Sequence, residues 1–391
     1  MPGAVFNLLD HPRTQAAPRI LQILPRLDAD GPSRNAIDIA RAAIAEGGVA
    51  VAASRSGALV GEFRQSGGIH MALPFDSISP VARLRILFRL RGAVTRHGIT
   101  VIHAYGRRGA RLARRLSAST GVPFVVSPTA SENHAPDQWL TADMAAARAV
   151  VAASDFVAAL VPKALPAGTR VEIIPRGVDL LRFDPAVIRA EKLVRQMQDW
   201  RADELSAVIL MPGRLAPGKG HDILLEAMSR MANKQATCLI LAREDENPRY
   251  HAALLHLIDT LRLAGRVRFV SHAPDMPVAY MIADVVAVPS RSPEAFNSIC
   301  AEALAMGRPV VASGTGGTPD IVIDGETGWL VPPVDPDALA AALDEALALD
   351  ETARIRLAKA SRAHIEHHYS LGAARQRIMT LYRGLGPPGR S

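Results

Sequence analysis

The sequence is poor in cysteine, in aromatic residues and in long apolar runs, and each shortage excludes a class of protein. With only two cysteines, Cys238 and Cys300, the chain cannot be a disulfide-framed secreted domain, and a reducing compartment fits it. No run approaches the roughly 18 uninterrupted apolar residues of a membrane-spanning helix. Residues 1–4 lack the basic and apolar regions of a signal peptide. We therefore expect a cytoplasmic protein.

Acidic residues are absent from Ser77 to Ser131, although the whole chain carries a formal net charge of +7. A basic surface of this kind attracts nucleic acid, an anionic membrane or an anionic substrate. Aromatic residues make up only 4% of the chain, too few to stack bases, so nucleic acid is not expected. An anionic membrane surface, which implies peripheral attachment at the inner face of the plasma membrane, stays open beside an anionic substrate and a merely solvated face. The arginines of this segment, 83–115, are Arg83, Arg85, Arg89, Arg91, Arg96, Arg107, Arg108, Arg111, Arg114 and Arg115.

Short apolar runs alternate with helical patterns in both halves of the chain. Continuous Val, Ile and Leu runs are typical of strands in parallel sheets buried on both faces. With 391 residues the chain exceeds the size of one hydrophobic core. The pattern predicts an α/β protein of two doubly wound, Rossmann-like domains, 1–185 and 186–391, that face a central cleft, with a final helix at about 372–386 packing back on the first domain. Predicted strands are 20–24, 49–53, 100–104, 123–127, 207–211, 237–242, 267–270, 285–289 and 309–312, and predicted helices include 33–45, 81–96 and 187–200.

An octet that follows the strand 207–211 carries the first chemical signal. It reads Gly-Arg-Leu-Ala-Pro-Gly-Lys-Gly from Gly213 to Gly220, and a helix begins near His221. Backbone amides in a glycine-bearing loop, a helix start and two cations make a diphosphate cradle. The octet nearly satisfies a P-loop, but Gly220 stands where a Ser or Thr hydroxyl must hold magnesium, which disfavours an ATPase or kinase.

The segment from Pro293 to Gly307 carries the second signal. Ser298 suits a helix N-cap and Gly307 a helix stop, so the helix start presents free amides. With Ser298 as the cap, Glu302 is one residue out of register for a capping box. Carboxylates on both sides of such amides suit sugar hydroxyls flanking a diphosphate, and this indicates a nucleotide-sugar site.

With these motifs in order, the chain resembles the retaining family 4 glycosyltransferases, which have the two-domain GT-B fold. The resemblance rests on the octet, on Glu294 and Glu302 with seven residues between them, and on the segments 174–185, 316–320 and 325–331. It covers about residues 20–381 and is strongest in the second half.

The resemblance implies a role for each matching residue. Arg214 and Lys219 would bind the diphosphate and stabilise the departing nucleotide, with Gly213 beside them. Glu302 would bind the ribose, and Glu294 the donor sugar. Backbone amides at the helix start would contact sugar and phosphate; they belong to Asn297, Ser298 and Ile299. Apart from the nucleotide-diphosphate sugar itself no cofactor is expected, and no metal, because neither Asp-x-Asp pair, 28–30 or 335–337, lies at the donor motifs.

The acceptor side departs from the family pattern. Many relatives carry Gly-Gly after the first strand, and here Gly31 is followed by Pro32, which removes one amide. Relatives often place a His-Gly pair where this chain has Thr129-Ala130. Gly31, Thr129 and His103, at the end of the strand 100–104, are the acceptor-side candidates, although a core or surface role for His103 stays open.

These observations predict a transferase that moves a sugar from a nucleotide-diphosphate sugar to a glycan or lipid-linked, lipopolysaccharide-type acceptor. Two alternatives use the same architecture: a nucleotide-sugar epimerase, which needs no acceptor, and a non-catalytic binding protein. The departures at Pro32 and Thr129 favour the last. The retained cations and glutamates disfavour it.

Overall fold

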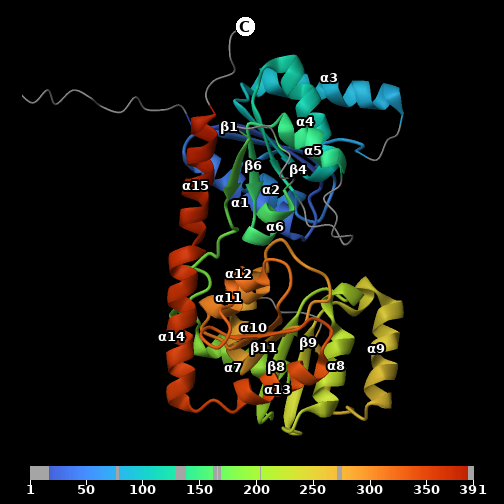
Figure 1. Cartoon of the computed structure of the whole chain (residues 1–391), viewed down its shortest axis with the longest axis vertical. Coiled ribbons are helices and arrows are strands. Elements are labelled where there is room, and N and C mark those ends of the chain that lie inside the picture. The colour runs from blue at the N-terminus through green and yellow to red at the C-terminus, as the bar shows by residue number, and fades with distance from the viewer. Residues whose placement is uncertain are drawn as a thin grey trace, which may run out of the picture.

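The computed structural model describes residues 17–75, 79–128, 138–161, 165, 169–202, 204–270 and 275–385. Within these residues each half of the chain builds one parallel sheet, ordered β3-β2-β1-β4-β5-β6-β7 and β10-β9-β8-β11-β12-β13 (Figure 1). The predicted α/β architecture of two doubly wound domains is confirmed. The strands are β1 (Arg19–Arg26), β2 (Val49–Arg55), β3 (Ile69–Ala72), β4 (Val101–Tyr105), β5 (Phe124–Ser127), β6 (Ala149–Ala152), β7 (Arg170–Ile173), β8 (Ala207–Pro212), β9 (Ala236–Leu241), β10 (Val267–Val270), β11 (Val285–Val288), β12 (Val310–Ser313) and β13 (Trp329–Val331).

Helices connect successive strands and cover both faces of each sheet (Figure 1). The helices are α1 (Gly31–Ala45), α2 (Val60–Gln65), α3 (Pro80–His97), α4 (Gly106–Thr120), α5 (Gln138–Ala145), α6 (Asp155–Leu160), α7 (Ala190–Asp199), α8 (His221–Arg230), α9 (Pro248–Thr260), α10 (Met276–Ile282), α11 (Ser298–Ala305), α12 (Thr318–Ile321), α13 (Pro336–Leu347), α14 (Glu351–His368) and α15 (Leu371–Gly384). None of these helices is both long enough and apolar enough to cross a membrane.

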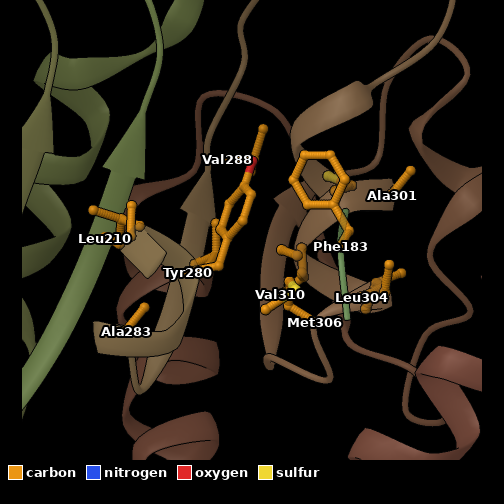
Figure 2. Close-up of a cluster of buried hydrophobic side chains, with 14 of the residues drawn as sticks. Phe183, Leu210, Tyr280, Ala283, Val288, Ala301, Leu304, Met306 and Val310 are labelled. Atoms are coloured by element: carbon orange, nitrogen blue, oxygen red, sulfur yellow. The ribbon is translucent and has the colours of Figure 1, made fainter. Parts of the chain in front are cut away.

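Alternate residues of the central strands enter two different cores, which explains the unbroken apolar runs. In β8, Val208 and Leu210 belong to the cluster on one face of the second sheet, whereas Ile209 and Met211 belong to the cluster on the other. Figure 2 shows the first cluster, where the ring of Tyr280 stands near that of Phe183. A strand buried on both faces needs apolar residues throughout.

The chain crosses between the two domains twice, at neighbouring points. The first crossing follows β7, and Val178 and Phe183 already belong to the core of the second domain. The second crossing joins α14 to α15. The two crossings are bonded together, because the Val178 amide donates to the Tyr369 carbonyl at 2.7 Å and the Leu371 amide to the Val178 carbonyl at 2.9 Å. These two hydrogen-bonded backbone segments form a short hinge between the domains.

The last two helices run along one side of the molecule and span both domains (Figure 1). α15 places Ile378, Met379, Leu381 and Tyr382 in the core of the first domain. The end of the chain thereby fastens the second half to the first.

One predicted helix is wrong in its extent. The range 187–200 divides into a 3-10 turn, Pro185–Val187, and α7, because Ile188 and Arg189 have extended backbone between them. The helical pattern of the apolar residues does not register this break.

Candidate active site

The two sheets bring their switch points together. In the first sheet the strand order reverses between β1 and β4, and in the second between β8 and β11. Loops that leave the carboxyl ends of strands at such a reversal diverge and open a crevice, where ligands of doubly wound folds bind. The loops after β1, β8 and β11 are therefore the walls of the site.

The octet forms a tight connection from β8 to α8. It contains a 3-10 turn, Pro217–Lys219, and Gly220 ends it with φ of 76° as the N-cap of α8. A side chain at Gly220 has no room, because a Cβ there would lie 1.9 Å from the carbonyl oxygen of Pro289, just after β11. Glycine is required by both the left-handed backbone and the close approach.

The loop after β11 is bonded directly to the octet. The amides of Arg291 and Ser292 donate to the carbonyl of Gly218 at 2.9 and 3.2 Å. On its other side, the Gly317 amide donates to the carbonyl of Glu294 at 2.8 Å. The loop that carries Glu294 is thus fixed at both ends against the second domain.

Asn297, rather than Ser298, caps α11, which corrects the sequence prediction. The Asn297 side chain is buried; it accepts a hydrogen bond from the Cys300 amide at 3.3 Å and donates one to the Thr318 hydroxyl at 3.3 Å. The hydrogen bond to Thr318 favours Asn297 as the cap. A local sequence pattern does not show this, because Thr318 is 21 residues further along the chain. The hydroxyl of Ser298 is left free for other partners.

Lys219 and Glu294 form an ion pair at the junction of the two loops. Lys219 Nζ lies 2.8 Å from Glu294 Oε1, and the Ser290 hydroxyl donates to the same oxygen at 3.1 Å. Both charged side chains are partly buried, at 21% and 29% exposure. The pair thereby joins the octet to the loop after β11.

A cavity of about 570 Å³ lies between the domains. It brings together four of the residues predicted from sequence, Gly31 from the first domain and Arg214, Lys219 and Glu294 from the second. Arg214 is exposed, and it forms no ion pair with any residue in the described ranges. The volume suits a ligand of the size of a nucleotide sugar.

The other predicted donor-site residues do not line this cavity. They are Gly213, Asn297, Ser298, Ile299 and Glu302. Glu302 accepts a hydrogen bond from the buried Tyr280 hydroxyl at 2.9 Å. Burial raises the pKa of Glu302, and the bond from Tyr280 together with the nearby Arg176 opposes that rise. Its role toward a ribose stays a prediction.

His103 does not reach the cavity, contrary to its assignment to the acceptor side. It is fully buried within β4; Nε2 lies 2.8 Å from the Ser127 hydroxyl and Nδ1 2.5 Å from the Tyr382 hydroxyl on α15. Ser127, at the end of β5, does line the cavity. His103 therefore supports a cavity residue from behind. Thr129, the third acceptor-side candidate, lies outside the described residues.

Arg176 is a cavity residue to which the sequence assigned no role. It lies in the first crossing between the domains, and its Nη1 donates to the Ser298 hydroxyl at 2.9 Å. A Cβ on Gly31 would be 3.0 Å from the same nitrogen, so the guanidinium bridges the starts of α1 and α11. Its Nε is buried without a partner among the described residues. Arg176 lies in the segment 174–185, which carries part of the family resemblance. Residue spacing alone does not show which loops approach its side chain.

His103 also makes a prediction about acid stability. Burial lowers its pKa to about 3, so it is neutral in the fold and binds a proton below about pH 6.5 only when unfolded. Its stabilising contribution is present above that pH and is lost as pH falls toward 3. We expect the free energy of unfolding to fall by up to about 2 kcal/mol from this group between pH 6.5 and 5.

Urea unfolding at several pH values checks this. His103→Gln should reduce the slope between pH 6.5 and 5, and part of it should remain because burial also lowers the pKa of His221, to about 4. The exposed His256→Gln should leave the slope as in the wild type. An unchanged slope in His103→Gln would show that the buried imidazole is not the group responsible.

Two parallel sheets whose switch points face one another across a cavity define a class of protein. This is the arrangement of the GT-B fold, in which two Rossmann-like domains face a central cleft, and the structure belongs to that class. The family model described as Glycosyltransferase Family 4 matches residues 29–182, and that of Glycosyl transferases group 1 matches residues 195–364. The chain thus belongs to the group 1, family 4-type glycosyltransferases, which confirms the resemblance seen in the motifs.

Curated relatives and solved structures agree with this placement. A D-inositol 3-phosphate glycosyltransferase from Salinispora tropica is 35% identical over 50% of this chain and 42% of its own length, and one from Corynebacterium diphtheriae is 36% identical over 54% and 50%. The chain spans about half the length of the curated relatives it matches.

Solved structures are similar over nearly the whole chain. A glycosyltransferase from Rickettsia africae superposes with a TM-score of 0.85 at 24% identity, covering 94% of this chain and 98% of its own. Anabaena HepE in complex with UDP and glucose superposes with 0.81 at 21% identity, covering 93% and 98%. WaaG, a glycosyltransferase involved in lipopolysaccharide biosynthesis, gives 0.70 at 15%, covering 93% and 100%. These likenesses show the shared fold.

Proposed function

We propose that this protein is a retaining glycosyltransferase that moves a sugar, such as a hexose, from a nucleotide-diphosphate sugar onto a glycan or lipid-linked acceptor. The main observation that supports this proposal is the cavity between the two domains, which is lined by Arg214, Lys219 and Glu294. Anabaena HepE, which shares the fold, has been solved in complex with UDP and with UDP-glucose. These complexes support a uridine nucleotide as the donor.

The proposed chemistry follows from charge. Breaking the bond between the anomeric carbon and the phosphate oxygen leaves a diphosphate whose negative charge grows toward the transition state. Cations fixed in advance stabilise that charge more in the transition state than in the ground state, which raises the rate rather than only the affinity. Lys219 and Arg214 supply the charge from the chain itself, so we propose that no resident metal or further cofactor takes part.

Glu294 is proposed to hold hydroxyls of the donor sugar. Donor binding then exchanges part of its ion pair with Lys219 for contacts with the sugar on one side and the diphosphate on the other. Arg176 and Ser298, beside the same cavity, are placed to accompany this exchange.

The acceptor is proposed to enter from the first domain. That half of the wall carries neutral polar groups, Asn35, Tyr105 and Ser127, which suit hydroxyls. Lipopolysaccharide biosynthesis by WaaG, which has the same fold, supports a lipid-linked acceptor, and the arginine-rich segment 83–115 supports work at the inner face of an anionic membrane. The phosphorylated inositol in the names of the curated relatives is a second acceptor to test.

A thermal-shift screen over UDP-, GDP- and ADP-sugars tests the donor. We expect a UDP-sugar at a hundred times its dissociation constant to stabilise the fold by roughly 2.7 kcal/mol, and the other nucleotides to do less. Equal stabilisation by all three would contradict a uridine-specific site, and none would contradict the donor site itself.

Product analysis tests the reaction. With the stabilising donor and a membrane-derived or inositol-phosphate acceptor, NMR should show transfer with the anomeric configuration kept. Rearrangement of the sugar in the absence of any acceptor would instead identify an epimerase. Binding without turnover would identify a non-catalytic protein.

A further inference from the structure

The helix α3 exposes an apolar stripe that the fold does not cover. Val81, Leu84 and Phe88 are 59%, 70% and 78% exposed. They are three and four residues apart, so they lie on one face of the helix. Single exposed apolar residues are ordinary, but three in line on one helix mark a contact surface.

The opposite face of α3 already holds the helix in place. Ile86, Leu90 and Val94 are buried in the core of the first domain. The exposed stripe is therefore additional to what folding requires. Loss of the stripe should leave the fold intact.

Arginines surround the stripe. By helical spacing Arg85 lies on one side of it and Arg91 on the other, and both are exposed. Every charged residue of α3 is basic, and the structure shows no ion pair from its arginines to any residue in the described ranges. Apolar side chains flanked by unpaired arginines match an anionic bilayer, in which the stripe meets acyl chains and the guanidiniums meet lipid phosphates.

We infer that α3 is the membrane-docking element of this protein, inserting Val81, Leu84 and Phe88 at the interface of an anionic bilayer. The inference rests on the proposed function only for its purpose, which is to bring the cleft to a lipid-linked acceptor. α3 lies at the end of the first domain remote from the second domain (Figure 1), so docking leaves the hinge and the second domain free to move. A second copy of the chain fits the stripe less well, because two basic helices repel.

Vesicle sedimentation of the full chain tests the inference. The variant Val81→Ser/Leu84→Ser/Phe88→Ser keeps every arginine, and the matched control Val187→Ser/Val194→Ser/Ile355→Ser removes exposed apolar groups from the second domain. On vesicles of phosphatidylcholine and phosphatidylglycerol in equal amounts, we expect the α3 variant to lose at least tenfold in partitioning, and the control to bind as the wild type does. Vesicles of phosphatidylcholine alone should bind neither the α3 variant nor the control.

Two further measurements distinguish membrane docking from self-association through the stripe. Phe88→Trp should show a blue shift of its emission with anionic vesicles only. Wild-type-like partitioning of the α3 variant would overturn the inference, and so would self-association of the wild type that the α3 variant abolishes. Stabilisation by the donor nucleotide should be the same in wild type and α3 variant, so failure of docking and failure of the proposed function give different results.

Discussion

Replacing Lys219 by alanine is expected to lower turnover at saturating donor by at least tenfold, and by about 100- to 1,000-fold if its charge acts in full on the departing diphosphate. The reason is its position, since Lys219 lines the cavity, and the one ion pair that its ammonium group forms within the described residues is with Glu294, at 2.8 Å. The substitution also leaves the Glu294 carboxylate with the Ser290 hydroxyl as its remaining hydrogen-bond partner among the described residues. Steady-state kinetics with the stabilising nucleotide sugar measures the effect.

Lys192→Ala is the matched control. Lys192 also pairs with a carboxylate, that of Asp275 at 3.4 Å, but it is 62% exposed and does not line the cavity. Its loss should change turnover little, because exposed ion pairs contribute little. Near-normal turnover in Lys219→Ala at saturating donor would remove Lys219 from the mechanism, whereas a raised KM alone would make it a binding residue.

Replacing Gly220 by alanine is expected to destabilise the protein by about 2 to 4 kcal/mol and to weaken donor binding at the same time. The new Cβ would stand 1.9 Å from the Pro289 carbonyl, in a backbone with φ of 76°. To relieve the clash, the octet must move away from the loop that carries Glu294. Stability and the donor site are thus linked through one contact between two loops.

Urea unfolding and donor thermal shift measure both effects. Gly92→Ala is the control, because Gly92 is exposed in the middle of α3 and a Cβ there meets nothing within 4 Å. Alanine at that position should stabilise the protein by up to about 1 kcal/mol. A Gly220→Ala protein as stable as the wild type, with the same donor affinity, would mean that the two loops are not held together as described.

The sequence predicted most of the central strands because burial on both faces leaves an unbroken apolar run, as in β8 and β11. It missed the buried strand β6, because an apolar run of only four residues does not distinguish a strand from a buried helix segment. It also did not predict the edge strands β3 and β13, of four and three residues, because edge strands are half exposed and their apolar signal is weak. The break between the 3-10 turn and α7 was missed for a similar reason, since a two-residue change in backbone leaves no mark on apolar periodicity.

The sequence predicted neighbouring site residues where they lie in one loop. Lys219 and Arg214 stand in one octet, and the structure brings them together with Glu294 in one cavity. The cap of α11 was misassigned because Asn297 is held by Thr318, a residue far along the chain. Arg176 and Ser127 could not be assigned, since their approach to the cavity depends on how two domains meet, which no local pattern encodes.

A crystal structure with a UDP-sugar bound is the decisive measurement of the donor site. We expect a diphosphate in the cavity between the domains, with its oxygens within hydrogen-bonding distance of the Arg214 and Lys219 side chains and with the sugar hydroxyls at Glu294. A nucleotide bound elsewhere, or a diphosphate in the cavity that contacts neither cation, would contradict it.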